Sequence, residues 1–248
     1  MSTERETVVR AENIAQRFGT RTIFRDVSFT VAAREVFVIL GGSGCGKSTL
    51  MKQLIGLHEP SAGRIEVLGH DMARERSLVL PRIGVMFQSG ALFGSMTLLE
   101  NVMVPIEIYT DLPPPARRVV ARTKLGLVGL ADAAGMLPGE ISGGMAKRAA
   151  IARALALDPP LLFLDEPAAG LDPITSAGLD TLILELRDTL GLTFIVVTHE
   201  LASIMAIADR CIMLDREAQG LIAEGPPAKL RAESTNPVVH AFFHREVL

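Results

Sequence analysis

One run of nine residues constrains this chain more than any other feature of its sequence. Residues 41–49 match the pattern G-x-x-x-x-G-K-[ST], with an apolar run before them at 36–40 and a run of helical character after them at 50–55. A strand, a glycine-rich loop and a helix in that order are the context that the pattern requires. The glycines allow backbone N–H groups to turn inward around phosphate oxygens, and the helix directs its positive end at the same anion. The run therefore predicts a phosphate-binding loop.

The side chains at the end of this loop indicate a nucleotide and a metal ion. Lys47 is expected to reach the β- and γ-phosphates, and Ser48 is expected to ligate Mg²⁺. A glycine-rich turn without a ligand is the alternative, but it leaves the Lys-Ser-Thr ending unexplained. Cys45 lies inside the loop, and we interpret it as a small loop residue rather than a redox switch. The predicted phosphate-binding residues are Gly41, Gly42, Ser43, Gly44, Cys45, Gly46, Lys47, Ser48 and Thr49.

Short apolar runs recur along the chain and predict the fold class. They are four or five residues long, which is the length of strands that are buried on both faces of a parallel sheet. Helical patterns lie between them. In residues 179–190, one helix face carries Leu179, Leu182, Ile183, Leu186 and Leu190. Strands that alternate with helices predict an α/β fold. The five predicted strands are 36–40, 83–87, 161–164, 194–197 and 211–214.

The middle of the chain departs from this alternation. Residues 90–158 carry helical patterns and no convincing strand, and prolines at 113–115 suit the first turn of a helix. We interpret this stretch as a helical insertion in the α/β core. The predicted organisation is one domain over 1–225, with its core at 1–89 and 159–225 and its helical part at 90–158. A C-terminal tail with a short helix follows at 226–248.

Two carboxylates follow the predicted strand 161–164. Asp165 and Glu166 stand where that strand ends, and ligands bind beyond the carboxyl ends of strands in open parallel sheets. Asp165 is expected to hold Mg²⁺ through water, and Glu166 to polarise a water for attack on the γ-phosphate. An Asp-Glu pair after a strand is more often a solvated turn, and the phosphate-binding loop elsewhere in the chain reverses that expectation.

A second anion site is indicated at residues 142–144. Ser142, Gly143 and Gly144 stand at the start of a strongly helical run that extends to residue 157. A serine and two glycines at a helix start offer hydroxyl and N–H donors to an anion. The run lies shortly before the strand that ends in the two carboxylates.

The order of these motifs resembles the ATP-binding subunits of ABC transporters. After the phosphate-binding loop come Gln88, the Ser-Gly-Gly run, Leu-Asp-Glu-Pro at 164–167, Gly-Leu-Asp at 170–172, and Thr-His at 198–199. The resemblance extends from about residue 8 to 225. It implies an ABC ATPase fold, which is a P-loop NTPase with a RecA-like core, a mostly parallel sheet and an inserted helical subdomain. It also implies hydrolysis of ATP with Mg²⁺, with Glu166, His199 and Gln88 as the catalytic residues.

The resemblance implies further roles for residues of the chain's own nucleotide site. Phe18 takes the place of the aromatic residue that stacks on adenine, although an ordinary core phenylalanine is the alternative. Gln88 matches the residue that contacts Mg²⁺ and the attacking water and senses the transmembrane partner. His199 matches the histidine that contacts the γ-phosphate. The implied metal ligands are Ser48, Gln88 and Asp165.

Other matching residues imply a homodimer. Ser142 and Gly144 match the signature that binds the γ-phosphate of ATP held by the opposite subunit, and Asp172 matches the loop that joins the two sites. Neither chain alone then completes a site, so ATP holds two copies together and hydrolysis releases them. Three residues depart from the commonest pattern of the family, namely Gly42, Ile141 and Met145.

Three segments narrow the resemblance to the ATPases of Mla (Mce-linked) phospholipid transporters of Gram-negative bacteria. They are residues 87–93, 142–150 and 171–175. This resemblance implies two copies of the chain beneath a permease dimer, with a lipid-binding Mce-domain protein and a STAS-domain subunit as further partners. It implies transport of phospholipid between the inner and outer membranes. It places the chain peripherally at the cytoplasmic face of the inner membrane. The apolar segment 91–99, beside Gln88, is where we expect the permease to dock.

The composition agrees with this interpretation and excludes other classes. An apolar fraction of 48% excludes general disorder, and a net charge of −3 argues against a nucleic-acid partner bound by bulk charge. The mean hydropathy is +0.33, yet no apolar run approaches the roughly 20 residues of a spanning helix. Two cysteines and a polar start at residues 1–7, without a signal-peptide core, favour a reducing cytoplasm.

Three alternatives remain open at this point. The chain is expected to be a transport ATPase, but a soluble ABC ATPase of the iron–sulfur assembly type and the ATPase of a different transporter share its motifs. A translation or DNA-repair ABC ATPase predicts tandem cassettes or a long coiled-coil insertion, and the sequence contains neither. Association with inner membranes that depends on a permease discriminates the transport ATPase from the soluble one.

Overall fold

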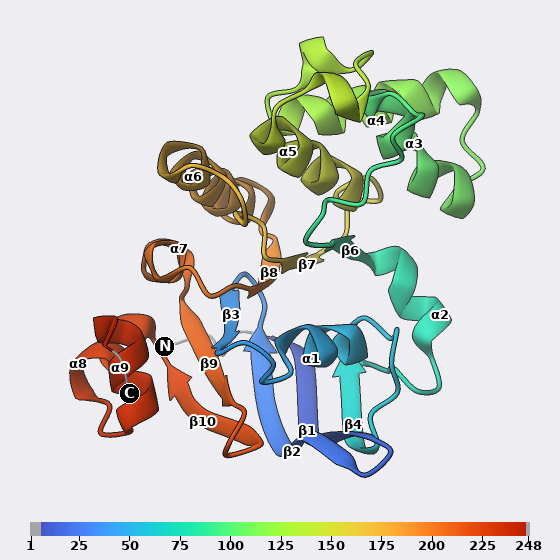
Figure 1. Ribbon diagram of the computed structural model, residues 1–248. Helices are drawn as coiled ribbons and strands as arrows, with labels where there is room; N and C mark the ends of the chain where they lie inside the picture. The colour runs from blue at the N-terminus through green and yellow to red at the C-terminus, as the bar shows by residue number, and fades with distance from the viewer. Residues whose placement is uncertain (1–5, 247–248) are drawn as a thin grey trace, which may run out of the picture.

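A six-stranded mixed sheet forms the centre of the molecule (Figure 1). The structure is a computed structural model that describes residues 6–246, so residues 1–5 of the polar N-terminal stretch lie outside it. The strand order is β10-β9-β3-β8-β7-β6. Five strands are parallel, and β10 runs antiparallel to β9 at one edge. The strands are β3 (Val36–Gly41), β6 (Ile83–Met86), β7 (Leu161–Asp165), β8 (Thr193–Val197), β9 (Arg210–Asp215) and β10 (Gly220–Gly225).

The parallel strands are the five that the apolar runs predict, and they are buried on both faces. In β3, Val38 and Leu40 belong to one hydrophobic cluster, whereas Phe37 and Ile39 belong to another on the opposite face of the sheet. Successive side chains of a strand point to opposite faces, so a continuous apolar run requires cover on both sides. This explains why the prediction from short apolar runs was correct.

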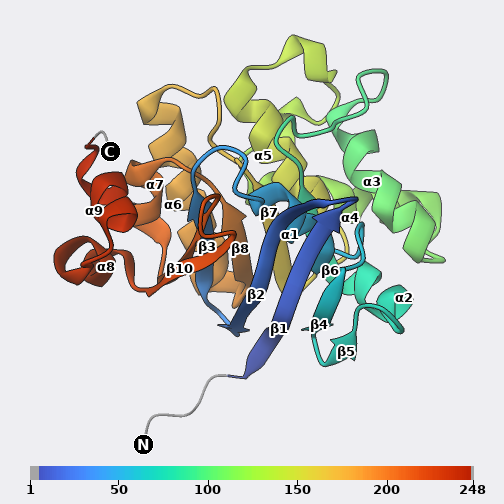
Figure 2. The ribbon, with the colours of Figure 1, turned by 60° about the horizontal axis from the view of Figure 1, so that its bottom comes forward.

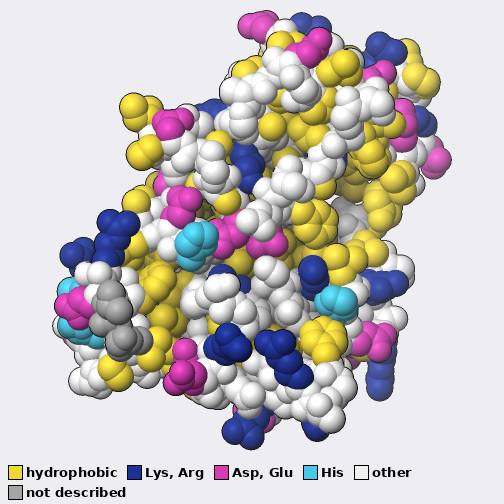
Figure 3. Space-filling model, viewed as in Figure 1, with side chains coloured by type: hydrophobic (Ala, Val, Ile, Leu, Met, Phe, Trp, Pro, Cys, Tyr) yellow, Lys and Arg dark blue, Asp and Glu magenta, His cyan; other side chains and the backbone are white. Residues whose placement is uncertain are grey.

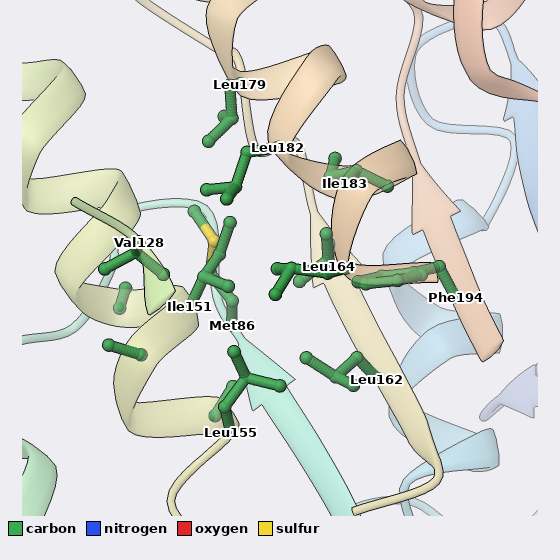
Figure 4. Packing of buried hydrophobic residues seen from close by; sticks show 14 of the residues in the cluster. Met86, Val128, Ile151, Leu155, Leu162, Leu164, Leu179, Leu182, Ile183 and Phe194 are labelled. Atoms are coloured by element: carbon green, nitrogen blue, oxygen red, sulfur yellow. The ribbon is translucent and has the colours of Figure 1, made fainter. Parts of the chain in front are cut away.

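Helix α6 and helix α5 cover one face of this sheet (Figure 4). Helix α6 (Pro173–Leu190) buries Leu182 and Ile183 against the strands, as its periodic pattern predicts. The last residue of that pattern, Leu190, is 46% exposed, so the expectation for it was wrong. It lies on the same helix face as Leu179, but it is the final residue of the helix and is not part of the buried cluster. Helix α5 (Gly143–Ala154) packs against the same face through residues that include Ile151.

A second, antiparallel sheet was not predicted from the sequence. It has the order β2-β1-β4-β5, and it forms a separate layer in Figure 2. Its long strands carry charged residues on an exposed face, and β1 has several register shifts against β2, so no apolar run marks them. Its strands are β1 (Thr7–Phe18), β2 (Arg21–Ala32), β4 (Ala62–Val67) and β5 (His70–Asp71). Helix α1 (Lys47–Leu54) lies between the two sheets and contacts both.

The stretch expected to be helical contains three packed helices and, in the described residues between β6 and β7, no strand. They are α3 (Leu98–Tyr109), α4 (Pro114–Leu127) and α5, and each packs against the other two. Pro114 is the first residue of α4, where the missing N–H of proline leaves no intrahelical bond unmade. A short helix, α2 (Arg76–Val79), precedes β6.

The C-terminal segment is part of the core. Helices α8 (Pro227–Glu233) and α9 (Pro237–His244) lie beside β9 and β10 in Figure 1. Val239 and Phe243 of α9 are fully buried in the same cluster as Ile204 of α7 (Leu201–Ile207). Among the described residues, none of the helices combines the length and apolar character that a membrane crossing requires.

Candidate active site

The phosphate-binding loop joins β3 to α1, and its backbone requires glycine at two positions. Gly41 has a φ of +146°, and a Cβ there would lie 2.2 Å from the backbone oxygen of Leu214. Gly46 has a φ of +105°, and a Cβ there would lie 2.8 Å from the ring of Phe24. Side chains at these positions are excluded by fixed neighbours and by the left-handed backbone. The loop therefore follows a path that brings its backbone close to any bound group.

The lysine and the helix start beside this loop provide positive charge. Lys47 is the first residue of α1, and its ammonium group donates to the carbonyl oxygens of Gly41 at 2.8 Å and Gly42 at 3.1 Å. No side chain caps the start of α1, so its first N–H groups open toward the loop. A helix start combined with an ammonium group binds phosphate well.

Two carboxylates lie at the end of β7, next to the loop. Asp165 ends the strand, and Glu166 follows it with a φ of +47° and with its N–H donating to the oxygen of Val197 at 2.8 Å. Oδ1 of Asp165 and Oε2 of Glu166 are buried and have no hydrogen-bond partner among residues 6–246. Buried polar atoms are normally paired, so these two oxygens indicate a site for a ligand.

The charges around Asp165 agree with that indication. Burial raises the pKa of Asp165, and the negative charge of Glu166 raises it further. Lys52 and Lys47 oppose this shift, which places the phosphate-loop lysine within electrostatic reach of the carboxylate. A bound divalent cation would stabilise the ionised form of this buried carboxylate. Carboxylate and hydroxyl oxygens are the ligands that Mg²⁺ prefers. Asp165 and Ser48 therefore fit a magnesium ion.

His199 completes this group from the next strand of the sheet. It follows the end of β8, and its Nδ1 lies 2.7 Å from Oε1 of Glu166. The histidine side chain is 63% exposed, whereas that of Glu166 is 11% exposed. In Figure 3 a histidine and several acidic side chains gather in the middle of the face, where β7 and β8 end in Figure 1. The structure thus brings the loop, Asp165, Glu166 and His199 together.

Two other predicted residues lie exposed at strand ends. Gln88 follows β6, and its carbonyl oxygen accepts a hydrogen bond from Lys147. Phe18 ends β1 and is 50% exposed, with its ring centroid 6.2 Å from that of His58 in an edge-on arrangement. An ordinary core phenylalanine does not leave half of its surface in solvent, so the position favours stacking on a ligand.

The remaining predicted residues form a separate group. Ser142 caps α5, and its Oγ accepts from the N–H of Met145 at 3.2 Å. Asp172 caps α6, and its carboxylate accepts from the hydroxyl of Thr175, which lowers the pKa of Asp172. A Cβ on Gly144 would lie 2.5 Å from Cγ2 of Thr175, so the two helix starts lie side by side. Figure 1 shows α5 among the upper helices and α1 against the lower strands.

Sequence reasoning missed two basic residues of α5 that contact this site. Lys147 is buried and donates to the backbone oxygens of Gln88 and Glu166, and Arg153 donates to those of Gly90 and Ala91. The only signal in the sequence is a lysine and an arginine in an alanine-rich helix, which is also typical of an exposed face. Their partners are backbone atoms, which no side-chain pattern reveals.

Comparison with known proteins agrees with the motif order. A family model described as "ABC transporter" matches residues 24–169. The intermembrane phospholipid transport system ATP-binding protein MlaF of Escherichia coli K12 is 42% identical over 229 residues, which cover 90% of this chain and 84% of that protein. The protein of the same name from Haemophilus influenzae is 40% identical over 229 residues, with 91% and 86% coverage.

A mycobacterial relative is of similar identity but is a longer protein. The probable ribonucleotide transport ATP-binding protein mkl of Mycobacterium tuberculosis H37Rv is 40% identical over 240 residues, which cover 95% of this chain. This chain spans 66% of the length of mkl.

Two solved structures confirm the predicted fold. The ATP-binding cassette MJ0796, in a dimeric post-hydrolysis state bound to ADP and Pi, has a TM-score of 0.78 and 28% identity, with 88% of this chain and 98% of that chain covered. The cbiO1 protein from Clostridium perfringens, part of the transporter complex cbiONQ, has a TM-score of 0.83 and 29% identity, with 92% of each chain covered. Together with the loop, the carboxylates and the Ser-Gly-Gly helix start, these likenesses show that the chain belongs to the ABC transporter family.

Proposed function

We propose that this chain binds and hydrolyses ATP as one of two identical nucleotide-binding subunits of a transporter. The observation that carries the proposal is the meeting of the phosphate-binding loop with Asp165 and Glu166. Each of these has a buried carboxylate oxygen without a partner in the part of the chain that the structure describes. The loop provides the charge and N–H groups that hold phosphates, and the carboxylates provide the groups that metal binding and water activation require.

The chain's own residues position the nucleotide. The loop binds the phosphate oxygens through its backbone, and Lys47 exchanges its bonds to the loop carbonyls for the β- and γ-phosphates. Phe18 stacks on the adenine ring. Ser48, Gln88 and Asp165 would hold Mg²⁺, which would neutralise part of the phosphate charge when it is bound.

Glu166, His199 and Gln88 act on the reacting groups. Glu166 accepts a proton from the attacking water, and its backbone is fixed by the bond to Val197. His199 holds Oε1 of Glu166 through Nδ1, so Oε2 stays directed toward the water. The exposed edge of His199 contacts the γ-phosphate, and Gln88 orients the water. Catalysis therefore consists of positioning and charge stabilisation.

The second copy of the chain supplies the rest of each site. Ser142, Gly143, Gly144 and Asp172 lie together at the starts of α5 and α6, apart from α1. The hydroxyl and N–H donors at the start of α5 suit the γ-phosphate of ATP that the second copy of the chain binds. In support, the similar MJ0796 structure is dimeric and bound to ADP and Pi. ATP then joins two copies, and hydrolysis releases them.

We also propose the division of the chain that the sequence predicts. The core comprises 1–89 and 159–225, the helical subdomain 90–158, and the tail 226–248. The supporting observation is that α3, α4 and α5 pack against one another between β6 and β7. The buried residues of α9 attach the tail to the core.

The transported substrate is phospholipid, moved between the inner and outer membranes of a Gram-negative bacterium. The two relatives named MlaF support this assignment, as do the segments 87–93, 142–150 and 171–175. The chain then works peripherally at the cytoplasmic face of the inner membrane. Its partners are an MlaE-like permease, an MlaD-like Mce-domain lipid-binding protein and an MlaB-like STAS-domain subunit. Phe93 and Met96, both exposed beside Gln88, form part of the permease-docking surface.

One experiment separates this assignment from the alternatives. The tagged chain is purified from membranes of its own organism, and its partner chains and bound lipids are identified by mass spectrometry. A permease, an Mce-domain protein and glycerophospholipid support the proposal. A nucleotide-transporting permease supports the ribonucleotide transport that the name of mkl states, and soluble partners alone support an iron–sulfur assembly ATPase.

A further inference from the structure

Helix α5 carries a buried lysine that contacts two segments of the active site at once. Lys147 is 8% exposed, and its ammonium group donates to the backbone oxygen of Gln88 and to that of Glu166, the latter at 3.3 Å. Both residues leave their strands at these points, so one side chain holds the backbone from which two proposed catalytic groups project. A buried ammonium group with two carbonyl partners fixes both segments relative to the helix.

A second basic residue extends this attachment along the loop after β6. Nη1 of Arg153 donates to the oxygen of Ala91 at 2.7 Å, and Nη2 donates to that of Gly90 at 2.8 Å. Gly90 and Ala91 both have a positive φ, of 73° and 49°. Side chains of α5 therefore bond to three carbonyl oxygens of the loop that begins at Gln88, those of residues 88, 90 and 91, and attach the loop to the helix.

The surroundings of Lys147 show that it also serves the charge of the site. Burial lowers the pKa of Lys147, and the carboxylates of Glu166, Asp165 and Glu200 oppose that shift. The lysine thus lies within electrostatic reach of the two carboxylates at the end of β7. A neutral residue at this place would remove a positive charge from beside them. It would also remove the Lys147 bond to the carbonyl oxygen of Gln88 and leave that of Glu166 with the N–H of Ala169 alone.

The position of Lys147 along α5 connects this attachment to the other group of site residues. Ser142 caps the helix, and Lys147 lies five residues later, about one and a half turns along the same rigid element. The start of the helix faces the group formed with Asp172 and Thr175. The first turn of α5 therefore carries the donors offered to the partner's nucleotide. Its second turn carries Lys147, which bonds to Glu166 of the same chain.

We propose that Lys147 is a positioning residue that couples contact between Ser142 and the partner's ATP to the placement of Glu166 and Gln88 in its own chain. This inference rests on the proposed ATPase function. When the first turn of α5 engages the partner's nucleotide, Lys147 carries the displacement to the backbone of both residues. Neither bond of Lys147 goes to the phosphate-binding loop, so the effect falls on turnover rather than on nucleotide binding.

The first test compares Lys147→Met with Lys147→Arg. Since a misplacement of about 1 Å can cost about 100-fold in rate, kcat of Lys147→Met is expected to fall about 100-fold, with KM for ATP within about twofold. Lys147→Arg keeps the charge and donors and is expected to recover at least about tenfold of that loss. Lys124→Met is the matched control, because Lys124 is a buried lysine of α4 that bonds to Asp158. It is expected to keep wild-type kcat.

The second test places Lys147→Met in only one of the two chains of a mixed dimer. Chains with two different tags are co-expressed, and dimers that carry both tags are purified. One chain carries Glu166→Gln, so the dimer has a single working site whose Glu166 belongs to the other chain. Lys147→Met in the chain with the working Glu166 is expected to lower turnover about 100-fold, as in the first test. The same change in the Glu166→Gln chain is expected to leave most of it.

The outcomes are separable. Equal loss in both arrangements, or full activity of Lys147→Met in the chain with the working Glu166, overturns the inference. Absence of turnover in the wild-type chain counts against the ATPase proposal instead. Lys147→Gln, which retains one donor, replaces Lys147→Met if thermal unfolding shows that the methionine variant does not fold.

Discussion

The imidazole of His199 and the carboxylate of Glu166 form a direct pair, with Nδ1 2.7 Å from Oε1. The two residues leave neighbouring parallel strands, and the buried carboxylate is thereby attached to a largely exposed side chain. One oxygen of Glu166 is fixed by this pair, and the other has no partner. A carboxylate with one oxygen held by a hydrogen bond and the other oxygen available to a water molecule suits activation of that water.

Glu166→Gln is expected to lower kcat by about 10²–10⁴-fold, because an amide does not accept the proton of the attacking water. ATP binding is expected to persist, since the phosphate-binding loop is unchanged. Single-turnover hydrolysis and equilibrium binding of ATP measure the two effects separately. Size-exclusion chromatography with ATP is expected to show a dimer. Glu233→Gln, at an exposed position of α8, is the control, and continued fast hydrolysis by Glu166→Gln would remove this residue as the base.

Lys47→Ala is expected to weaken ATP binding by about 10–150-fold, which corresponds to about 1.5–3 kcal/mol for hydrogen bonds to a charged group. The ammonium group is bonded to the carbonyl oxygens of Gly41 and Gly42 in the loop. Isothermal titration with ATP measures the change. Lys229→Ala, an exposed lysine of α8, is expected to bind ATP normally. Unchanged affinity and turnover in Lys47→Ala would refute the site.

Ser142→Arg tests whether the nucleotide site is shared between two copies. The variant is expected to bind ATP and to have almost no turnover, because an arginine blocks the donors at the start of α5. When it is mixed with an equal amount of Glu166→Gln, half of the dimers contain one chain of each variant. Each of these dimers has one complete site of its two, so about a quarter of wild-type activity is expected to return. Steady-state hydrolysis is measured before and after mixing. If mixing restores nothing beyond the sum of the two variants, the sites are not complementary.

Asp165→Asn is expected to raise the stability of the fold while it removes activity. The folded-state pKa of Asp165 is raised by burial and by the charge of Glu166, so its ionisation costs stability as pH rises through that pKa. The asparagine variant avoids this cost, and its Tm is expected to exceed that of the wild type by about 1–3 °C at pH 7. The difference is expected to shrink as acidification through the raised pKa of Asp165 protonates the wild-type carboxyl. A Tm difference that grows on acidification would contradict this account.

Much of the fold and site could be predicted because the signals are local. The loop 41–49 requires glycine where Gly41 and Gly46 meet fixed neighbours, and the five parallel strands are apolar because both of their faces are covered. The antiparallel sheet was missed because β1 and β2 present charged residues on an exposed face and pair with shifted register. The exposure of Leu190 was missed because periodicity does not show where a helix leaves the core.

The sequence by itself determined which residues are available for the chemistry: the phosphate-binding loop, the carboxylates after a buried strand and the Ser-Gly-Gly helix start. Each is a short pattern whose backbone geometry follows from its own residue types. Only the tertiary structure decided which of them meet. It paired His199 with Glu166 across neighbouring strands, grouped Ser142 and Gly144 with the start of α6, and directed Lys147 to the backbone of Gln88 and Glu166. These contacts join segments far apart in the chain. Several of them involve backbone atoms, which are the same in every residue type, so no sequence pattern reveals them.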